Sequence, residues 1–299
     1  SIDGFLTDIT FKTKFDKAEE RRVKYVRQYP SKKHLIYNEG YFLWIDNKGM
    51  ILFSLHPHGC FNGLQTFHQI IRWCKINAQS TQKEYISIEV ADFPMIEKRA
   101  FHLDLKDLMP TYDYIMEFVE LLAHFKYNCF VIEYEDKFPY KDYLEVVVHE
   151  YALTEEQHKT LKQKCQENFI EIIPLIQVFG HIEFILEKEK FLHLQEQKTG
   201  IPNPNLYDEH TAFSLCPLKD ESEKFARELV DQIVEGHPEA EYIHIGADEV
   251  YQLGTCPECS KWLEDEGNTK SKLFIDFINK VATRVLEHGK KPIMWHDYL

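Results

Sequence analysis

The stretch YIHIGADEVY, residues 242–251, places an aspartate and a glutamate side by side at the end of an apolar run. Two neighbouring carboxyl groups with different surroundings can hold different protonation states, which general acid–base catalysis needs. Successive side chains of a strand face opposite sides of a sheet, so Asp248 and Glu249 cannot both point inward from regular strand geometry. We therefore expect the strand to end there, with Asp248 directed into a pocket and Glu249 on the first loop residue. The alternative is that Glu249 caps the next helix.

The elements that must position these carboxylates form a repeated β-α pattern. Short, nearly continuous apolar runs are typical of strands that are buried on both faces of a parallel sheet. Such runs cover residues 100–105, 129–134, 171–176, 242–247 and 292–295. Amphipathic segments between them predict helices over residues 111–126, 154–168, 221–236 and 268–289. The pattern predicts an α/β fold whose catalytic groups lie at the carboxyl ends of the strands.

Polar residues gather at the carboxyl ends of all five predicted strands. They are Asp104, Lys106, Glu133, Glu135, Asp136, Gln177, His181, Asp248, Glu249, His296 and Asp297. Any one of them, taken alone, is explained as a helix N-cap or a solvated loop charge. Because the carboxyl ends of parallel strands meet at one edge of a sheet, their convergence favours an active site there.

The first ninety residues have a different pattern of apolar runs and turn residues. Short runs rich in β-branched and aromatic residues, separated by turn residues, predict an antiparallel meander. The runs cover residues 34–37, 41–46 and 50–55. A helix is predicted over residues 63–76, and residues 85–90 return to the alternation of a strand. We therefore expect a small α+β domain over residues 1–97 and a second domain over residues 98–299.

Composition excludes some kinds of partner. The formal net charge of −14 over 299 residues repels a phosphate backbone, so we predict that nucleic acid is not a partner. The basic residues of 17–27 alternate with acids, which is typical of a solvated helix. No apolar run approaches the roughly 20 residues that cross a bilayer, and the N-terminus does not have the form of a signal peptide. Because the chain begins at Ser1, the sequence does not decide whether a leader segment was removed. It also does not decide the compartment or whether the protein forms a homodimer.

The seven cysteines cannot all pair with one another. Those that occur singly, most of them expected to be reduced and buried, are Cys60, Cys74, Cys129, Cys165 and Cys216. Cys256 and Cys259 form a CPEC motif, which suits either a disulfide that clips a loop or half of a zinc site. Because no second pair stands at ligand spacing, we predict no metal site and no cofactor.

Several stretches, in order along the chain, are similar to the motifs of one enzyme family. HIGADEV, residues 244–250, resembles the H-x-G-x-D-E motif of glycoside hydrolase family 20, the β-N-acetylhexosaminidases. ADFPMIEKRAFHLDLK, residues 91–106, is similar to the segment that enters the first barrel strand of that family. Other similar stretches are NEGYFLWI (38–45), GLQTFHQII (63–71), NCFVIEYEDKFPY (128–140) and PLIQVFGHIEF (174–184). The likeness covers residues 34–299 and is nearest to the hexosaminidase D branch.

The resemblance implies a (β/α)8 TIM barrel after the small α+β domain, and a retaining exo-β-N-acetylhexosaminidase. In this family the nucleophile is the carbonyl oxygen of the substrate's own 2-acetamido group, which forms an oxazolinium intermediate. The resemblance implies that Glu249 is the general acid and later the base that activates water. It implies that Asp248 holds the acetamido N–H and stabilises the positive charge. The implied substrate is a glycan or small molecule with a terminal β-linked GlcNAc or GalNAc.

The resemblance also implies four further site residues. Arg99 matches an arginine that binds sugar hydroxyls, although RA stands here where the family has RG. Trp295 matches an aromatic residue that walls the acetamido pocket, and the alternative for it is a core tryptophan. Asp136 and His181 lie where the family has an aspartate and a histidine that support the acid.

The sequence departs from the family pattern in its number of strands. A TIM barrel has eight βα units, whereas this chain provides about five. We expect it to be part of a longer protein, since an open barrel exposes strand edges. Two alternatives therefore stand: a carbohydrate-binding relative without catalytic activity, and a metal-dependent hydrolase. The hydrolase needs three converging ligands, for which Asp248, His181 and Asp136 are the candidates.

Overall fold

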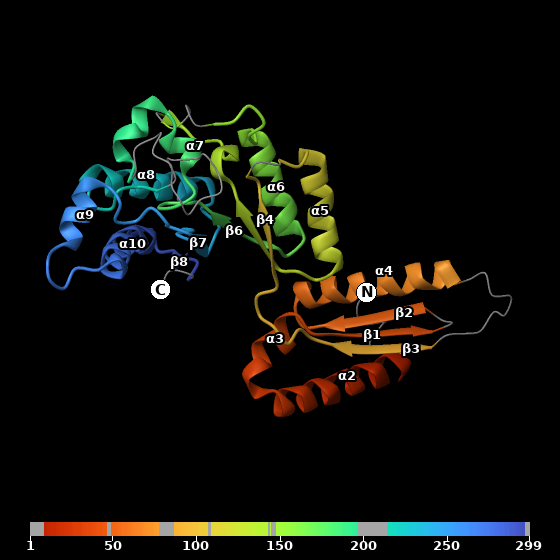
Figure 1. Cartoon of the computed structure of the whole chain (residues 1–299). Coiled ribbons are helices and arrows are strands. Elements are labelled where there is room, and N and C mark those ends of the chain that lie inside the picture. Colours follow the sequence, from red (N-terminus) through yellow and green to blue (C-terminus); the bar gives the residue numbers. More distant parts are fainter. Residues whose placement is uncertain are drawn as a thin grey trace. The chain divides into compact units, whose positions relative to one another are not determined.

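Figure 1 shows the computed structural model, whose elements belong to two compact units. The structure describes residues 9–46, 49–77, 87–106, 109–142, 144, 148–196 and 214–296. Unit 1 consists of Ser1–Arg99 and Val119–Asn128, and unit 2 of Ala100–Phe118 and Cys129–Leu299. Each unit has its own sheet, and the domain boundary at residues 97 and 98 stays a prediction.

A three-stranded antiparallel sheet forms the centre of unit 1, in the order β2-β1-β3. Its strands are β1 (Tyr41–Asp46), β2 (Gly49–Ser54) and β3 (Ile88–Asp92). Helices α2 (Ile9–Gln28) and α4 (Pro57–Asn77) lie on opposite faces of this sheet (Figure 1). Strand alternation explains this, because Phe42 and Trp44 pack against Ala18 of α2, whereas the Tyr41 hydroxyl lies 2.6 Å from the Thr66 hydroxyl of α4.

Most elements predicted for this part of the chain are confirmed, but the strand over residues 34–37 is wrong. These residues form helix α3 (Lys33–Asn38), which follows the 3-10 helix η1 (Pro30–Lys32). Leu35 and Ile36 are both buried. A strand would send two consecutive residues to opposite faces, whereas a helix keeps them about 100° apart. The third strand of the sheet is β3, which pairs with β1, and the predicted residues 85 and 86 lie outside the described residues.

Five parallel strands form the sheet of unit 2, in the order β4-β5-β6-β7-β8 (Figure 1). They are β4 (Ala100–Asp104), β5 (Cys129–Glu133), β6 (Glu171–Leu175), β7 (Tyr242–His244) and β8 (Lys291–Ile293). The helices α5 (Tyr112–His124), α6 (Glu155–Glu167), α8 (Asp220–Gly236) and α10 (Lys270–Glu287) alternate with them along the chain. The predicted α/β fold and its order of strands and helices are therefore confirmed, although β7 and β8 end earlier than expected.

Shorter elements complete the connections that the structure describes in unit 2. They are η2 (Glu135–Lys137), α7 (Glu183–Leu186), η4 (Glu189–Leu194) and α9 (Pro257–Leu263). The core between the sheet and its helices is mostly aliphatic and includes aromatic pairs: the ring of Phe179, after β6, lies 4.5 Å from that of Phe277 on α10. Among the described residues, no helix is long and apolar enough to cross a membrane.

Candidate active site

The carboxyl ends of the five strands lie at one edge of the sheet, because every neighbouring pair is parallel. Backbone hydrogen bonds continue the ladder beyond the strands. The N–H of Ile176 donates to the carbonyl of His244 at 2.9 Å, and the N–H of Ile245 donates to that of Ile293 at 2.8 Å. This ordered edge fixes the starting points of the polar segments that follow the strands.

The turn after β7 has an unusual backbone. Gly246, Ala247 and Glu249 have φ angles of 63°, 70° and 47°. Positive φ is uncommon for a residue with a side chain, and such strain gathers at functional sites. A Cβ atom at Gly246 would collide with Oε1 of Gln177, so glycine is required there. This turn replaces strand alternation and allows Asp248 and Glu249 to approach the same partner.

That partner is His181, which contacts both carboxylates. Its Nε2 lies 3.4 Å from Oδ2 of Asp248 and 3.2 Å from Oε2 of Glu249. On the other side of the ring, Nζ of Lys106 lies 3.1 Å from Nδ1. Because a lysine ammonium only donates, Nδ1 accepts, and a neutral ring then carries its proton on Nε2, facing the carboxylates. The structure thus brings together three residues that were predicted from the sequence.

The two carboxylates have different surroundings. Asp248 accepts a hydrogen bond from Nε2 of Gln177 at 2.9 Å, and its side chain is 24% exposed. Glu249 is 47% exposed and accepts a hydrogen bond from the Tyr251 hydroxyl at 2.7 Å. Asp248 is therefore fixed by buried groups while Glu249 reaches solvent. The two carboxylates therefore differ in the partners that hold them and in their access to solvent.

Gln177 connects Asp248 to a second carboxylate. Its Nε2 also donates to Oε1 of Glu133 at 2.8 Å, and its Oε1 accepts from the backbone N–H of Ala247 at 3.1 Å. The other oxygen of Glu133 lies 3.0 Å from Nε2 of His102. Burial favours a raised pKa for Glu133, but the hydrogen bonds from His102 and Gln177 outweigh it and lower the pKa. The hydrogen bond between His102 and Glu133 also raises the pKa of His102.

Lys106 is held against His181 by two carboxyl groups. Its Nζ lies 3.2 Å from Oε1 of Glu183 and 3.5 Å from Oε1 of Glu135. Burial raises the pKa of Glu135 to about 8, although the charge of Lys106 opposes this shift. Both carboxyl groups thus contact the ammonium group that faces His181.

Trp295 lies beside this network and is half-buried. Its ring is 4.6 Å from that of His244 and 5.7 Å from that of His102. Its backbone N–H donates to the carbonyl of Gly246 at 3.0 Å, which places it against the strained turn. Burial lowers the pKa of His244 to about 4, so that ring is neutral. Partial exposure disfavours the core alternative for Trp295, and its role as a pocket wall stays a prediction.

Asp136 is not part of the His181 network. Its carboxylate forms an ion pair with Lys137, and Glu135 rather than Asp136 approaches Lys106. Within the described part of the chain, Asp248, His181 and Asp136 do not form a group of converging metal ligands, as a metal-dependent hydrolase would need. The supporting role of Asp136 stays a prediction.

Arg99 belongs to unit 1. Its guanidinium forms an ion pair with the carboxylate of Glu39, and its Nε donates to the carbonyl of Lys126 at 2.8 Å. A second guanidinium nitrogen donates to the carbonyl of Ile96, also at 2.8 Å. Within unit 1 the side chain is therefore well ordered by its partners, and its binding to sugar hydroxyls stays a prediction.

Three members of the network were missed as site residues in the sequence. Glu183 and Tyr251 each stand two positions after a predicted residue, His181 and Glu249, and this spacing alone could have suggested them. His102 lies within β4, where strand alternation gives no sign of its bond to Glu133.

Comparison with known proteins identifies the family. Residues 97–299 match the catalytic domain of glycosyl hydrolase family 20. Hexosaminidase D of Bos taurus is 36% identical over 203 residues, which cover 67% of this chain and 56% of that protein. Hexosaminidase D of Homo sapiens is 35% identical over 205 residues, which cover 68% of this chain and 40% of that protein. This chain thus spans about half the length of these curated relatives.

A solved structure supports the same fold. The X-ray structure of Flavobacterium johnsoniae chitobiase matches with a TM-score of 0.71 at 20% identity, over 88% of this chain and 40% of that chain. The family match extends from the segment before β4 to the end of the chain, so it includes the strained turn, both of its carboxylates and His181. On this match and on its parallel sheet, the chain belongs to glycosyl hydrolase family 20.

Proposed function

We propose that this protein is a retaining exo-β-N-acetylhexosaminidase, which removes terminal GlcNAc or GalNAc from a glycan. The observation that carries the proposal is the contact of His181 with two adjacent carboxylates, at 3.4 Å from Asp248 and 3.2 Å from Glu249. Family membership supports hydrolysis of a glycosidic bond, and the relatives named above are hexosaminidases.

In the first step, the carbonyl oxygen of the 2-acetamido group attacks the anomeric carbon, and the bond to the leaving oxygen breaks. Glu249 donates its proton to that oxygen, since its exposed carboxyl group can reach the leaving group. Asp248 accepts the acetamido N–H and stabilises the oxazolinium charge, because the hydrogen bond from Gln177 fixes its orientation. His181 donates to the carboxylate that forms on Glu249.

In the second step, the Glu249 carboxylate takes a proton from water, and the water oxygen bonds to the anomeric carbon. The bond between that carbon and the acetamido oxygen breaks, which regenerates the acetamido group and restores the proton on Glu249. Two inversions give net retention. In the same proposal, Arg99 binds sugar hydroxyls, Trp295 walls the acetamido pocket and Asp136 supports the acid.

The first test is Glu249→Gln, assayed on two substrates with different leaving groups. The amide cannot give up a proton, so we expect kcat on a GlcNAc disaccharide to fall about 10²- to 10⁴-fold. The loss on p-nitrophenyl N-acetyl-β-glucosaminide should be smaller for the bond-breaking step, because p-nitrophenolate leaves without protonation. Glu266→Gln, an exposed glutamate, is the matched control. Unchanged turnover in Glu249→Gln would contradict the assignment of the acid.

The second test is inhibition by a thiazoline analogue of the oxazolinium ion. Participation of the acetamido group predicts that this analogue binds at least about 10²-fold more tightly than the substrate. Weak binding together with normal turnover would instead indicate two enzyme carboxylates acting on the anomeric carbon. Sugar binding without turnover would support the carbohydrate-binding alternative.

A further inference from the structure

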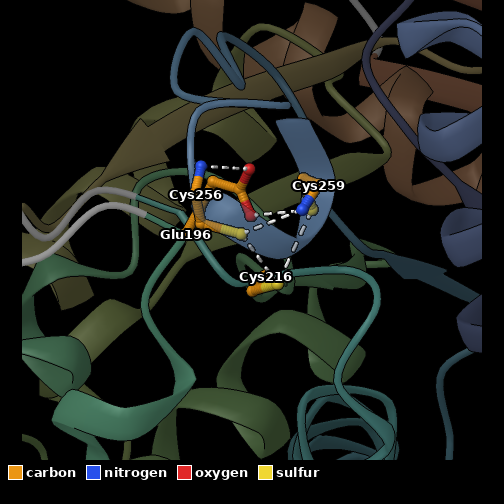
Figure 2. A group of neighbouring side chains, drawn as sticks. All are labelled: Glu196, Cys216, Cys256 and Cys259. Carbon is orange, nitrogen blue, oxygen red and sulfur yellow. Dashed lines mark hydrogen bonds between the residues drawn. The ribbon is translucent and has the colours of Figure 1, made fainter. Parts of the chain in front are cut away.

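A buried cluster of three cysteines and one glutamate lies in unit 2. Figure 2 shows the side chains of Glu196, Cys216, Cys256 and Cys259 turned toward one another. One ligand atom from each lies within 4.8 Å of the other three, and no member is more than 6% exposed. The proposed catalytic steps use none of these residues, so the cluster needs an explanation of its own.

The distances within the cluster suit tetrahedral coordination. The sulfur of Cys216 lies 3.5 Å from that of Cys256 and 3.7 Å from that of Cys259, whose sulfur lies 3.2 Å from Oε2 of Glu196. Bond lengths of about 2.3 Å for Zn–S and about 2.0 Å for Zn–O give tetrahedral edges of about 3.8 Å between sulfurs and about 3.5 Å between sulfur and oxygen. A disulfide would require about 2.05 Å, so these sulfur atoms are not bonded to each other.

The chemistry of the four groups favours a cation. Thiols and a carboxyl group packed into one water-excluded space cannot all ionise unless a positive charge compensates them. Thiolate sulfur is a soft ligand that selects zinc and similar metals over magnesium or calcium, and tetrahedral sulfur-rich sets are typical of zinc. Four protein ligands leave no open position for substrate, which is the arrangement of a structural site.

Backbone groups hold the cluster in this arrangement. Oε1 of Glu196 accepts hydrogen bonds from the N–H groups of Gly254, Thr255 and Cys256 at 2.8, 2.9 and 3.3 Å. These bonds fix the carboxylate with Oε2 directed at the sulfurs. The N–H of Cys259 donates to the sulfur of Cys256 at 3.4 Å. Such partners orient metal ligands and spread the net negative charge that three thiolates and a carboxylate leave around a divalent ion.

We propose that Glu196, Cys216, Cys256 and Cys259 bind one Zn²⁺ ion in a closed structural site. Binding displaces the three thiol protons, and the proton of the Glu196 carboxyl group where it is present, to solvent, and forms three Zn–S bonds and one Zn–O bond. The ion would join the chain around the β-bridge between Gln195 and Leu215 to the start of helix α9, where Cys256 is the N-cap and Cys259 lies in the first turn. This proposal does not depend on the proposed hydrolase activity.

The test is elemental analysis of the whole protein, purified without a polyhistidine tag and then dialysed against zinc and against buffer. We expect about one zinc per chain. Cobalt substitution should give a thiolate-to-cobalt charge-transfer band. Cys216→Ser should lower the zinc affinity at least about tenfold, so that it keeps less zinc after dialysis against buffer, because even outer partners of a metal site change affinity by that amount. Cys165→Ser, which replaces another fully buried cysteine, is the matched control and should keep its zinc.

Two results would overturn the proposal. The first is wild-type protein that holds less than about a tenth of a zinc ion per chain after dialysis against zinc and shows no charge-transfer band with cobalt. The second is a native mass that is lighter by two hydrogens because of a disulfide within the cluster. Both measurements use the wild-type protein, so they decide the question even if Cys216→Ser fails to fold.

Discussion

At the scale of single residues, the position of one proton couples the two adjacent carboxylates. With Nδ1 of His181 accepting from Lys106, the N–H of the ring is on Nε2, which faces both Asp248 and Glu249. One N–H makes one strong hydrogen bond at a time. When Glu249 gives up its proton in the proposed first step, the new carboxylate becomes the better acceptor. His181 can then move its bond toward Glu249 while Gln177 continues to hold Asp248.

Gln177→Leu tests whether this amide positions Asp248. The change removes the donor shared by Glu133 and Asp248 and leaves a buried carboxylate with one partner fewer. A charge-assisted hydrogen bond contributes roughly 1.5–3 kcal/mol, so kcat/KM should fall about tenfold to 150-fold. The pH profile of kcat/KM should also shift, which general loosening of the fold would not produce. Gln163→Leu, on the exposed side of α6, is the control, and equal effects in both variants would contradict the role.

At the scale of elements, Gly246→Ala tests whether the turn after β7 must remain close to Gln177. Gly246 and Gly289 have similar φ angles, 63° and 71°, but a Cβ atom at Gly246 collides with Gln177 whereas one at Gly289 meets nothing within 4 Å. Both variants should lose about 1–2 kcal/mol of stability from the left-handed backbone. Only Gly246→Ala should also lower kcat/KM, by about tenfold or more. Equal activities, measured well below the unfolding temperature, would contradict this view of the turn.

The strands and long helices could be predicted because each one has a pattern of its own. Residues 129–132 and 172–176 are apolar throughout, as strands covered on both faces must be. HLIY, residues 34–37, shows the limit of this reasoning, since a short run with an apolar centre suits a strand and a buried helix equally well. In the structure, the N–H groups of Glu39 and Gly40 donate hydrogen bonds to the carbonyl of Leu35 and so end that helix. A short stretch of sequence does not show whether such a segment forms a strand or a helix.

The partners within the sites were less predictable, because they come from different elements. The carboxylates were expected at the end of a strand, but the bonds of Gln177 depend on the register between β5 and β6 and on the strained turn. In the same way, the CPEC motif supplies only Cys256 and Cys259, and the other two members of the cluster, Glu196 and Cys216, stand far from it in the sequence.

The packing of helices α6 and α8 predicts a pH effect on stability. His158 of α6 and His237, which follows α8, lie 2.9 Å apart between their Nε2 atoms in a buried aromatic cluster. Burial, together with the neighbouring His237 and the positive charge of Lys162, lowers the pKa of His158 to about 3. Below about pH 6.5 the unfolded chain therefore binds a proton at His158, whereas the folded chain leaves this residue neutral until the pH approaches 3. Stability should fall as the pH drops from 6.5 toward 3.

At pH 5 this effect of His158 amounts to about 2 kcal/mol. In His158→Gln, the loss of unfolding free energy between pH 7 and pH 5, measured by urea titration, should be smaller than in the wild type by about that amount. His193→Gln, which replaces an exposed histidine, should retain the wild-type dependence. The same pH dependence in His158→Gln as in the wild type would show that the packing between α6 and α8 does not exclude the proton.

At the scale of the whole molecule, the net charge of −14 is compatible with the proposed substrate. A terminal N-acetylhexosamine is uncharged, so the field of an acidic protein neither attracts nor repels it. Its recognition must then depend on contacts close to the site, such as those of Asp248 and Trp295 in the proposed mechanism. The same field repels a polyanion, which is the basis for predicting that nucleic acid is not a partner.

The proposed zinc ion also acts at this scale, because it joins segments that the sequence separates widely. Removing it with a strong chelator should lower the thermal midpoint, since an ion that binds only the folded state adds stability. Free zinc at about 1,000-fold its Kd contributes about 4 kcal/mol, which corresponds to about 8–16 °C for a domain of 150–250 residues. Differential scanning calorimetry with and without chelator would measure the shift, which Cys165→Ser should retain and Cys216→Ser should lose. Because the proposed site is closed, kcat far below the midpoint should not change, whereas an immediate loss of activity would indicate a metal used in catalysis.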